Sequence, residues 1–209
     1  MIIVFARAPV LGQAKTRLAA RLGEWRAARL HCWMIARAIA TAREVGRVEL
    51  HGTRRHSFFR RLNVKFRLQR GRDLGERMHR ALARSARPAI LIGSDCPALS
   101  ARDLQRALRS LRGGYDAVLA PAEDGGYALV GVRRAIDLFT GIDWGTSRVY
   151  EQTRRKLSGY RWRAQRTVWD VDRPEDLERL RALRFASGSA RGARRSGDSR
   201  ARSGGSGRP

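Results

Sequence analysis

Short runs of apolar residues alternate with longer amphipathic segments along most of this chain. An unbroken apolar run of about four to eight residues is typical of a strand buried in a sheet, whereas apolar residues that recur every three or four positions are typical of a helix facing a core. On this pattern we expect strands within residues 2–6, 47–52, 64–68, 89–93, 116–120, 127–132 and 160–168.

The amphipathic segments between these runs predict helices. We expect them over residues 25–45, 74–86, 100–111 and 147–157, followed by a last helix that Pro174 opens. Ser100 and Asp103 have the spacing of a capping box. Strands that alternate with helices predict an α/β domain with a mostly parallel sheet. The residues expected to face inward are Leu30, Trp33, Met34 and Ala38, then Leu74, Met78, Ala81 and Leu82, and finally Leu177, Leu180 and Leu183.

The length allows one full domain. The chain has 209 residues, and domains commonly have about 100–200. Residues 186–209 differ from the rest, because they contain no aromatic residue and no aliphatic residue larger than alanine. Such a segment cannot bury enough apolar surface to order itself. We therefore expect a domain over residues 1–185 and a disordered tail rich in Gly, Ser and Arg over residues 186–209.

The net charge is extreme: the chain has 44 Lys and Arg residues and 19 Asp and Glu residues, for a formal net charge of +25. The arginines are spread along the chain and accompany no helix-turn-helix, zinc-finger or RNA-binding pattern, so we interpret them as solvated surface and expect no specific nucleic-acid partner. No apolar run approaches the roughly 20 residues that span a bilayer. The two cysteines, Cys32 and Cys96, are too few to form a disulfide framework. We expect both to be reduced, mostly buried thiols, and we expect the protein to be cytoplasmic.

The first loop with candidate chemistry follows the first strand, where ligands of α/β sheets bind. It contains Arg7, Pro9, Gly12, Lys15 and Arg17. Lysine and arginine at the start of a helix can hold phosphate groups. Pro9 and Ala14 stand where a Walker A loop needs glycine, which excludes that motif. A plain surface loop with scattered basic residues remains the alternative.

Carboxylates after later strands suggest a metal site. Asp95 follows the apolar run 89–93 and comes after Ser94, which is itself a candidate for binding the nucleotide phosphates. Asp170 and Asp172 lie on one face of an extended segment. Carboxylate oxygens suit Mg²⁺ or Mn²⁺, which bridge the oxygens of a diphosphate. The alternatives are that Asp95 accepts from backbone N–H groups of its own loop and that Asp172 serves the start of the last helix.

A third loop carries Glu123 and Asp124 before Gly125 and Gly126. The glycines would let the backbone approach a ligand closely. An Asp-Gly-Gly sequence alone is also typical of a hairpin turn. The four histidines share no spacing, and we interpret His31 and His79 as ordinary residues of helix faces.

Six of these segments together resemble the DUF2064 family, which is assigned to type A glycosyltransferases of the nucleotide-diphospho-sugar transferase superfamily. The resemblance implies a three-layer α/β/α Rossmann-like fold, a nucleotide at the first loop and a divalent metal near Asp95. It adds Asp73, Gly75 and Arg77 as nucleotide-binding candidates, and it joins Asp172 to the metal site. The matching segments are 5–9, 15–18, 73–78, 93–97, 123–127 and 170–177.

The chain departs from the family pattern at four positions. Arg7 replaces a usual lysine and keeps the positive charge, whereas Leu11 replaces a proline and Arg173 a threonine. Ala98 replaces an acidic residue, which removes a polar group beside Asp95.

We therefore expect a metal-dependent glycosyltransferase that uses a nucleotide-sugar donor. Lys15, Arg17 and the metal would neutralise the departing diphosphate, and Asp124 or Glu123 would activate the acceptor hydroxyl as a base. The alternative is a nucleotidyltransferase, which would join an NTP to a phosphorylated or carboxylated acceptor and release pyrophosphate. A basic nucleic-acid-binding protein is the third hypothesis. The acceptor and the oligomeric state cannot be inferred from the sequence.

Overall fold

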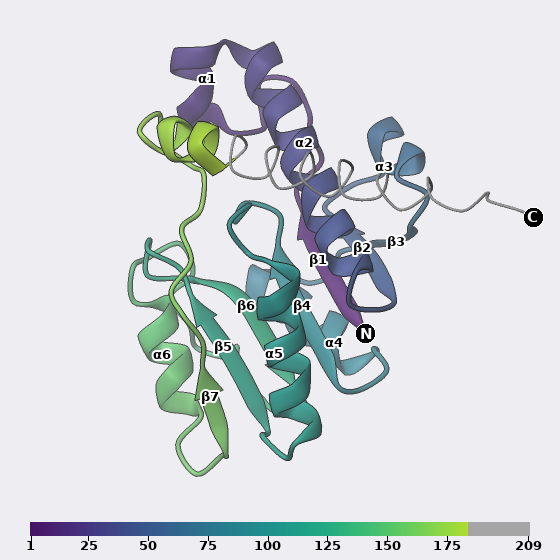
Figure 1. Cartoon of the computed structure of the whole chain (residues 1–209), viewed down its shortest axis with the longest axis vertical. Coiled ribbons are helices and arrows are strands. Elements are labelled where there is room, and N and C mark those ends of the chain that lie inside the picture. Colours follow the sequence, from purple (N-terminus) through teal and green to yellow (C-terminus); the bar gives the residue numbers. More distant parts are fainter. Residues whose placement is uncertain (184–209) are drawn as a thin grey trace, which may run out of the picture. The chain divides into compact units, whose positions relative to one another are not determined.

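The computed structural model describes residues 1–183 (Figure 1). These residues belong to two compact units, one over Met1–Pro174 and one that starts at Glu175. The seven strands of the described chain lie in the first unit, and residues 176–183 of the second are helical. The tail predicted over residues 186–209 lies outside the described residues.

A seven-stranded sheet forms the centre of the first unit, with the order β3-β2-β1-β4-β6-β5-β7 (Figure 1). Within this sheet β6 runs antiparallel to its neighbours, β4 and β5, and the other pairs are parallel, so the predicted mostly parallel α/β sheet is confirmed. The strands are β1 (Ile2–Ala6), β2 (Val48–Gly52), β3 (Lys65–Leu68), β4 (Ala89–Gly93), β5 (Ala117–Pro121), β6 (Tyr127–Val132) and β7 (Trp162–Ala164).

Helices cover both faces of the sheet, because successive side chains of a buried strand point to opposite sides. Ile2 and Val4 of β1 pack in one core cluster with residues of α2 and α5, and Ile3 and Phe5 pack in a second cluster with residues of α4. The three predicted layers are therefore present. The helices of this unit are α1 (Thr16–Leu22), α2 (Glu24–Arg43), α3 (Ser57–Arg61), α4 (Leu74–Ala83), α5 (Ala101–Arg112) and α6 (Val149–Lys156).

The inward face of α2 differs from the prediction. Its buried residues are Ala27, His31, Met34, Ile35, Ile39 and Ala42, whereas Leu30, Trp33 and Ala38 are half-buried. The helix α3 was not predicted, and β7 is shorter than the expected range.

The cysteines also differ slightly from the prediction. Cys32 and Cys96 are both free, as expected, but each is half-buried rather than mostly buried. Burial raises the pKa of both thiols, which disfavours the reactive thiolate.

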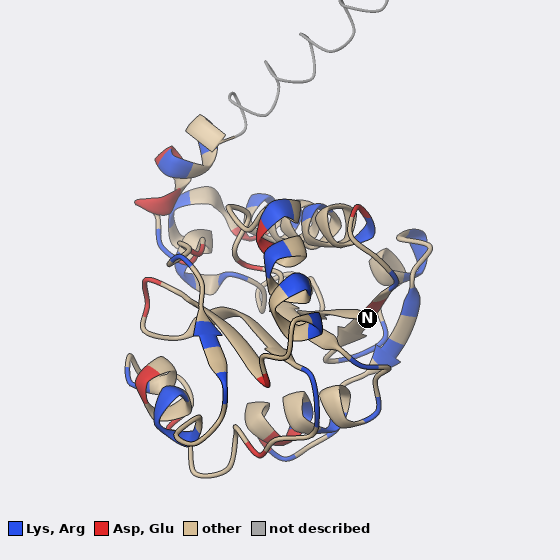
Figure 2. Ribbon diagram, turned by 60° about the horizontal axis from the view of Figure 1, so that its bottom comes forward, with Lys and Arg blue, Asp and Glu red and all other residues tan. Residues whose placement is uncertain are grey.

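The positive charge is distributed over the whole fold. Lys and Arg residues occur on nearly every helix and on many loops, with acidic residues among them (Figure 2). No helix within residues 1–183 combines the length and the apolar character that a membrane crossing needs.

A buried carboxylate connects β2 to the edge strand β3. The carboxylate of Glu49 lies 2.8 Å from Lys65 Nζ and 2.8 Å from Arg67 Nε, and His51 Nε2 lies 3.3 Å away. Burial alone would raise the pKa of Glu49, but hydrogen bonds from these neighbours outweigh it and lower the pKa to about 2.

This carboxylate predicts a loss of stability in acid. A pKa that is lower in the folded than in the unfolded chain stabilises the fold above the unfolded pKa, and this stability is lost as the pH falls through the folded value. We therefore expect the melting temperature of the wild type to fall more steeply between about pH 4.5 and pH 2 than that of Glu49→Gln. Parallel melting curves for the two proteins over this range would contradict the prediction.

Candidate functional site

Lys15 is held by an unusual backbone conformation. It precedes α1 with φ 52° and ψ 50°, in the left-handed region that non-glycine residues rarely adopt. Its side chain is only 6% exposed. The strained backbone thereby turns a buried ammonium group inward, toward the carboxyl ends of β1 and β4.

Asp95 lies directly opposite this ammonium group. It follows β4 and Ser94, and its Oδ2 lies 3.1 Å from Lys15 Nζ, while Ser94 Oγ donates to its Oδ1 at 3.3 Å. Burial acts to raise the pKa of Asp95, but the charge of Lys15 and the hydrogen bonds from Lys15 and Ser94 lower it. The carboxylate is therefore ionised, and 44% of its side chain remains exposed.

Asp172 completes the cluster from the far end of the sequence. Its Oδ1 lies 3.7 Å from Lys15 Nζ, and its Oδ2 contacts Arg17. The backbone N–H of the neighbouring Val171 donates to the carbonyl of Asp95 at 2.9 Å, which fixes the two segments together. Two predicted cations and two predicted carboxylates thus converge from three separate segments.

His31 belongs to this cluster, although we predicted an ordinary helix-face residue. It is 3% exposed, its Nε2 lies 3.1 Å from the carbonyl of Arg7, and its Nδ1 lies 3.6 Å from Asp95 Oδ1. Burial lowers the pKa of His31, although Asp95 acts to raise it. In the neutral ring Nε2 is the donor to the carbonyl, so Nδ1 presents its lone pair, and Nδ1 has no hydrogen-bond partner among residues 1–183.

The sequence contained one signal for this role. His31 lies three and four residues before Met34 and Ile35, on the stripe of α2 that is buried against the sheet. A polar residue on a buried stripe needs a partner. The signal was missed because we placed the stripe on Leu30, Trp33, Met34 and Ala38, and of these four Met34 alone is buried.

The acidic loop joins β5 to the antiparallel β6, so it is the hairpin connection that was the alternative interpretation of its sequence. Asp124 Oδ1 accepts from the backbone N–H of Gly126 at 2.9 Å, and Glu123 N–H donates to the carbonyl of Val168 at 3.1 Å. Gly125 has φ +88° and packs against the backbone of Ser147. The turn geometry and a functional role are compatible, since both carboxylate side chains are exposed.

Asp124 and Asp170 act on the same thiol as Asp95. After burial, the charges of Asp95, Asp170 and Asp124 are the main causes that raise the pKa of the Cys96 thiol. Each of these three predicted acidic residues therefore lies within electrostatic range of Cys96.

The nucleotide-binding candidates around the start of α4 have local roles in the structure. Asp73 caps α4 by accepting from Glu76 N–H, and Arg77 Nε donates to the carbonyl of Gly71. A Cβ atom on Gly75 would lie 2.8 Å from a Trp144 ring atom, so this glycine allows close packing. These contacts account for the local geometry of the three residues, and their binding of a nucleotide stays a prediction.

The other candidates in the first loop differ in how they are placed. Arg7 is exposed, Pro9 is buried, and Gly12 has φ +73°. Arg7 reaches the Lys15 cluster through its backbone, since its carbonyl faces His31 Nε2. A direct role of Pro9 and Gly12 in nucleotide binding stays a prediction.

The cluster offers carboxylate oxygens that suit a divalent cation, but the protein supplies only some of the ligands that such a cation needs. Among residues 1–183, no three His, Cys, Asp or Glu residues lie close enough to hold a metal ion together. The Asp95 and Asp172 carboxylates nevertheless already share one cation, the Lys15 ammonium group. Mg²⁺ is commonly held by one or two carboxylates together with water and substrate phosphates, which this pair fits.

The chain is similar to a known family and to several solved structures. The family described as "Uncharacterized protein conserved in bacteria (DUF2064)" matches residues 33–146, a range that includes Asp95 and Asp124. A "putative nucleotide-diphospho-sugar transferase" from Desulfovibrio desulfuricans G20 is 31% identical, with a TM-score of 0.77, over 82% of this chain and 81% of that one. No curated protein matches the chain.

Two more distant structures share the fold. A CMP:2-keto-3-deoxy-manno-octonic acid synthetase, solved with CTP, is 14% identical with a TM-score of 0.61, over 90% of this chain and 98% of that one. Rv0371c from Mycobacterium tuberculosis H37Rv is 18% identical with a TM-score of 0.55, over 86% and 95%. Rv0371c has also been solved with manganese. At these identities the similarity concerns the fold alone.

Proposed function

The chain belongs to the DUF2064 family, and on that premise we propose that it is a metal-dependent transferase that acts on a nucleotide-sugar. The single observation that carries the proposal is the convergence of Lys15, Arg17, Asp95 and Asp172 at the carboxyl ends of β1 and β4. Ligands of open α/β sheets bind at this edge. The similarity to the Desulfovibrio protein supports a transferase of this general kind.

The charges of the cluster suit the chemistry of a diphosphate leaving group. In a glycosyl transfer, negative charge grows on the departing diphosphate, and cations that are already in place stabilise it. Lys15 is preorganised by burial, and Arg17, which is exposed, has a planar fork that can bind two phosphate oxygens. We assign phosphate binding to these two residues.

Asp95 and Asp172 would hold the metal, with Asp170 as a further candidate. When bound, Mg²⁺ or Mn²⁺ would supply charge neutralisation at the diphosphate oxygens. Because the protein offers so few ligands at this point, the remaining ones would come from the substrate phosphates and water. His31 lies beside this pair, with Nδ1 3.6 Å from Asp95 Oδ1, and its ring is fixed by the Arg7 carbonyl.

The acceptor base is assigned to the hairpin loop. Asp124 and Glu123 are exposed carboxylates, and Asp124 is near enough to Asp95 for both charges to act on Cys96. A carboxylate at this position can accept the proton of an acceptor hydroxyl. The same cluster would also serve nucleotidyl transfer, in which an NTP reacts with a phosphorylated or carboxylated acceptor and pyrophosphate leaves.

The proposal predicts that metal and nucleotide bind together. Titration calorimetry should show weak binding of Mn²⁺ alone, and at least about tenfold tighter binding when a nucleoside diphosphate is present, because the phosphates supply the missing ligands. Equal Mn²⁺ affinity with and without nucleotide would contradict the shared site.

A screen of nucleotide-sugars and NTPs with and without Mn²⁺ would identify the donor by thermal shift. The product then separates the two reactions: release of a nucleoside diphosphate supports glycosyl transfer, and release of pyrophosphate supports nucleotidyl transfer. A chain that turns over neither class, and gains no stability from either, would contradict the proposed function.

A further inference from the structure

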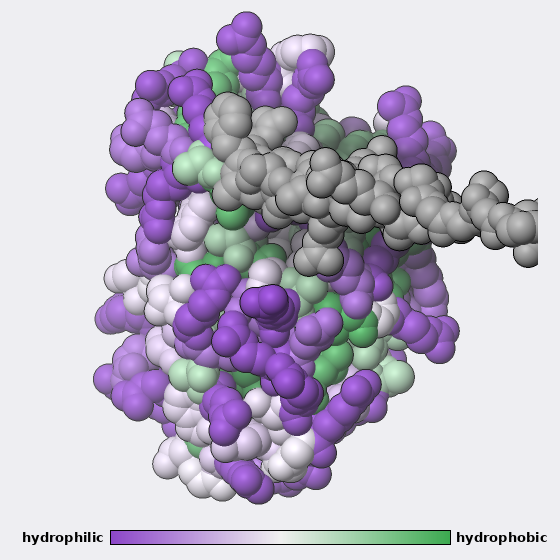
Figure 3. All heavy atoms as spheres, in the orientation of Figure 1, coloured by the Kyte–Doolittle hydropathy of each residue, from purple (hydrophilic) through white to green (hydrophobic). Residues whose placement is uncertain are grey.

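A cavity of about 580 Å³ lies between α5 and the segment that contains β7, and its lining residues are different from those of the Lys15 cluster. Four of the lining residues are arginines: Arg106 and Arg109 from α5, Arg163 from β7, and Arg166 just after β7. Hydrophilic side chains gather over this part of the surface (Figure 3). The volume is that of a small-molecule site.

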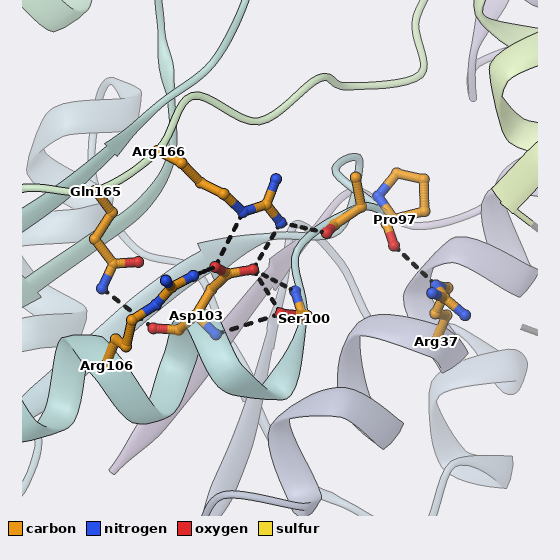
Figure 4. Close-up of polar contacts among 8 residues, drawn as sticks. Arg37, Pro97, Ser100, Asp103, Arg106, Gln165 and Arg166 are labelled. Atoms are coloured by element: carbon orange, nitrogen blue, oxygen red, sulfur yellow. Dashed lines mark hydrogen bonds and ion pairs between the residues drawn. The ribbon is translucent and has the colours of Figure 1, made fainter. Parts of the chain in front are cut away.

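Two of these arginines are held in place by one buried carboxylate. Asp103 is 1% exposed; its Oδ1 accepts from Arg106 Nη2 at 2.6 Å and its Oδ2 accepts from Arg166 Nη2 at 2.7 Å. Both guanidinium groups point at Asp103 (Figure 4). Burial would raise the pKa of Asp103, but bonds from Arg166, Ser100 and Arg106 outweigh it and lower the pKa. Asp103 is therefore ionised and fully engaged.

The other two arginines have no acidic partner within residues 1–183. Arg163 donates to the hydroxyl of Tyr115 at 2.8 Å and lies 4.5 Å from the centre of its ring. The Arg109 side chain makes no hydrogen bond and no ion pair with any described residue. The lining thus contains four guanidinium groups and no carboxylate, and Asp103, which pairs with two of them, balances one of the four positive charges.

We propose that this cavity binds a small polyanion with clustered phosphate groups. Guanidinium N–H groups donate to phosphate oxygens, and here Asp103 holds Arg106 and Arg166, and Tyr115 holds Arg163, before a ligand arrives. A small ligand fits better than a single-stranded nucleic acid, because the Tyr115 ring in the lining already contacts Arg161 and Arg163 and offers no stacking platform. Since arginines rather than carboxylates line the cavity, binding needs no divalent cation.

The test is calorimetric titration of the full chain with inorganic tripolyphosphate. A chelator removes divalent metal, and salt at about 0.15 M screens the general surface charge. We expect one ion to bind per chain, and the double variant Arg109→Ala/Arg163→Ala to bind at least about tenfold more weakly.

The matched control is Arg60→Ala/Arg61→Ala, which removes the same charge from exposed positions on α3 and should change the affinity less than about twofold. Arg109→Glu is a second test, because Arg109 has no partner in residues 1–183 whose loss would disturb folding.

Several results would overturn the proposal. Equal weakening in the α3 control would show that binding depends only on net charge. If tripolyphosphate does not bind, while a short DNA duplex binds and its affinity depends on Arg109, the surface is a site for nucleic-acid backbones instead. Tripolyphosphate binding that requires Mn²⁺ and is lost in Asp95→Asn would assign the phosphate to the Lys15 cluster. That last result would contradict the α5–β7 site and leave the proposed function intact.

Discussion

Replacing Asp95 by asparagine is expected to abolish Mn²⁺-dependent nucleotide binding and to leave the protein folded. The substitution keeps the size of the side chain and removes the charge that faces Lys15 at 3.1 Å. Without the carboxylate the metal loses a charged ligand, and we expect the affinity of a nucleoside diphosphate in the presence of Mn²⁺ to fall by about 100-fold or more. Titration calorimetry with and without Mn²⁺ measures this change.

Asp143→Asn is the matched control for this prediction. Asp143 is also an exposed aspartate in an ion pair, with Arg148 at 3.0 Å, and it takes no part in the Lys15 cluster. We expect the control to bind nucleotide as the wild type does. If Asp95→Asn retains the full metal-dependent affinity, Asp95 is no part of the site.

Replacing Gly125 by alanine is expected to destabilise the protein strongly, although it adds a single methyl group. A Cβ atom at this position would lie 2.2 Å from the carbonyl oxygen of Ser147, and the backbone has φ +88°. The atoms that the new methyl group would meet belong to the main chain of Ser147. The main chain of Gly125 is also bonded to this segment, since Tyr150 N–H donates to the carbonyl of Gly125 at 2.8 Å. We expect the free energy of unfolding to fall by about 2–4 kcal/mol, measured by urea denaturation.

Gly141→Ala separates the two contributions to this loss. Gly141 also has a positive φ, +69°, but a Cβ atom there would meet nothing within 4 Å. This control should therefore lose only about 1–2 kcal/mol, the cost of the left-handed backbone for a residue with a Cβ atom. A Gly125→Ala protein no less stable than Gly141→Ala would show that the hairpin loop moves away from Ser147 without difficulty.

The apolar pattern was sufficient to predict most of the sheet. The apolar runs predicted at 2–6, 89–93 and 127–132 are the strands β1, β4 and β6, with the same bounds. The prediction succeeds here because a fully buried strand needs an unbroken apolar sequence. The capping box of Ser100 and Asp103 is present in full. The antiparallel direction of β6 could not be taken from its composition, although the Asp-Gly-Gly sequence before it indicated a hairpin.

The candidate site was predictable in its residue types and less so in its geometry. Lys15, Asp95 and Asp172 were identified because each follows or ends a loop at the same sheet edge. The contact of Lys15 with both carboxylates depends on its left-handed backbone, which no local pattern indicates for a lysine. His31 was missed because the buried stripe of α2 is set by the space over the sheet, which periodicity alone does not determine.

The α5–β7 cavity was equally beyond sequence analysis. Arg106, Arg109, Arg163 and Arg166 are four of many arginines, and the chain does not distinguish them until α5 and β7 are brought together. Asp103, predicted as part of a helix cap, has a second role in holding two of them.

A crystal structure of the protein grown with Mn²⁺ and a nucleoside diphosphate, with anomalous data collected at the manganese edge, would decide whether the Lys15 cluster binds metal and nucleotide together. We predict an anomalous peak within coordination distance of the Asp95 carboxylate, with the diphosphate between that peak and the side chains of Lys15 and Arg17. A nucleotide bound elsewhere on the protein, with no manganese at Asp95, would exclude the Lys15 cluster as the binding site.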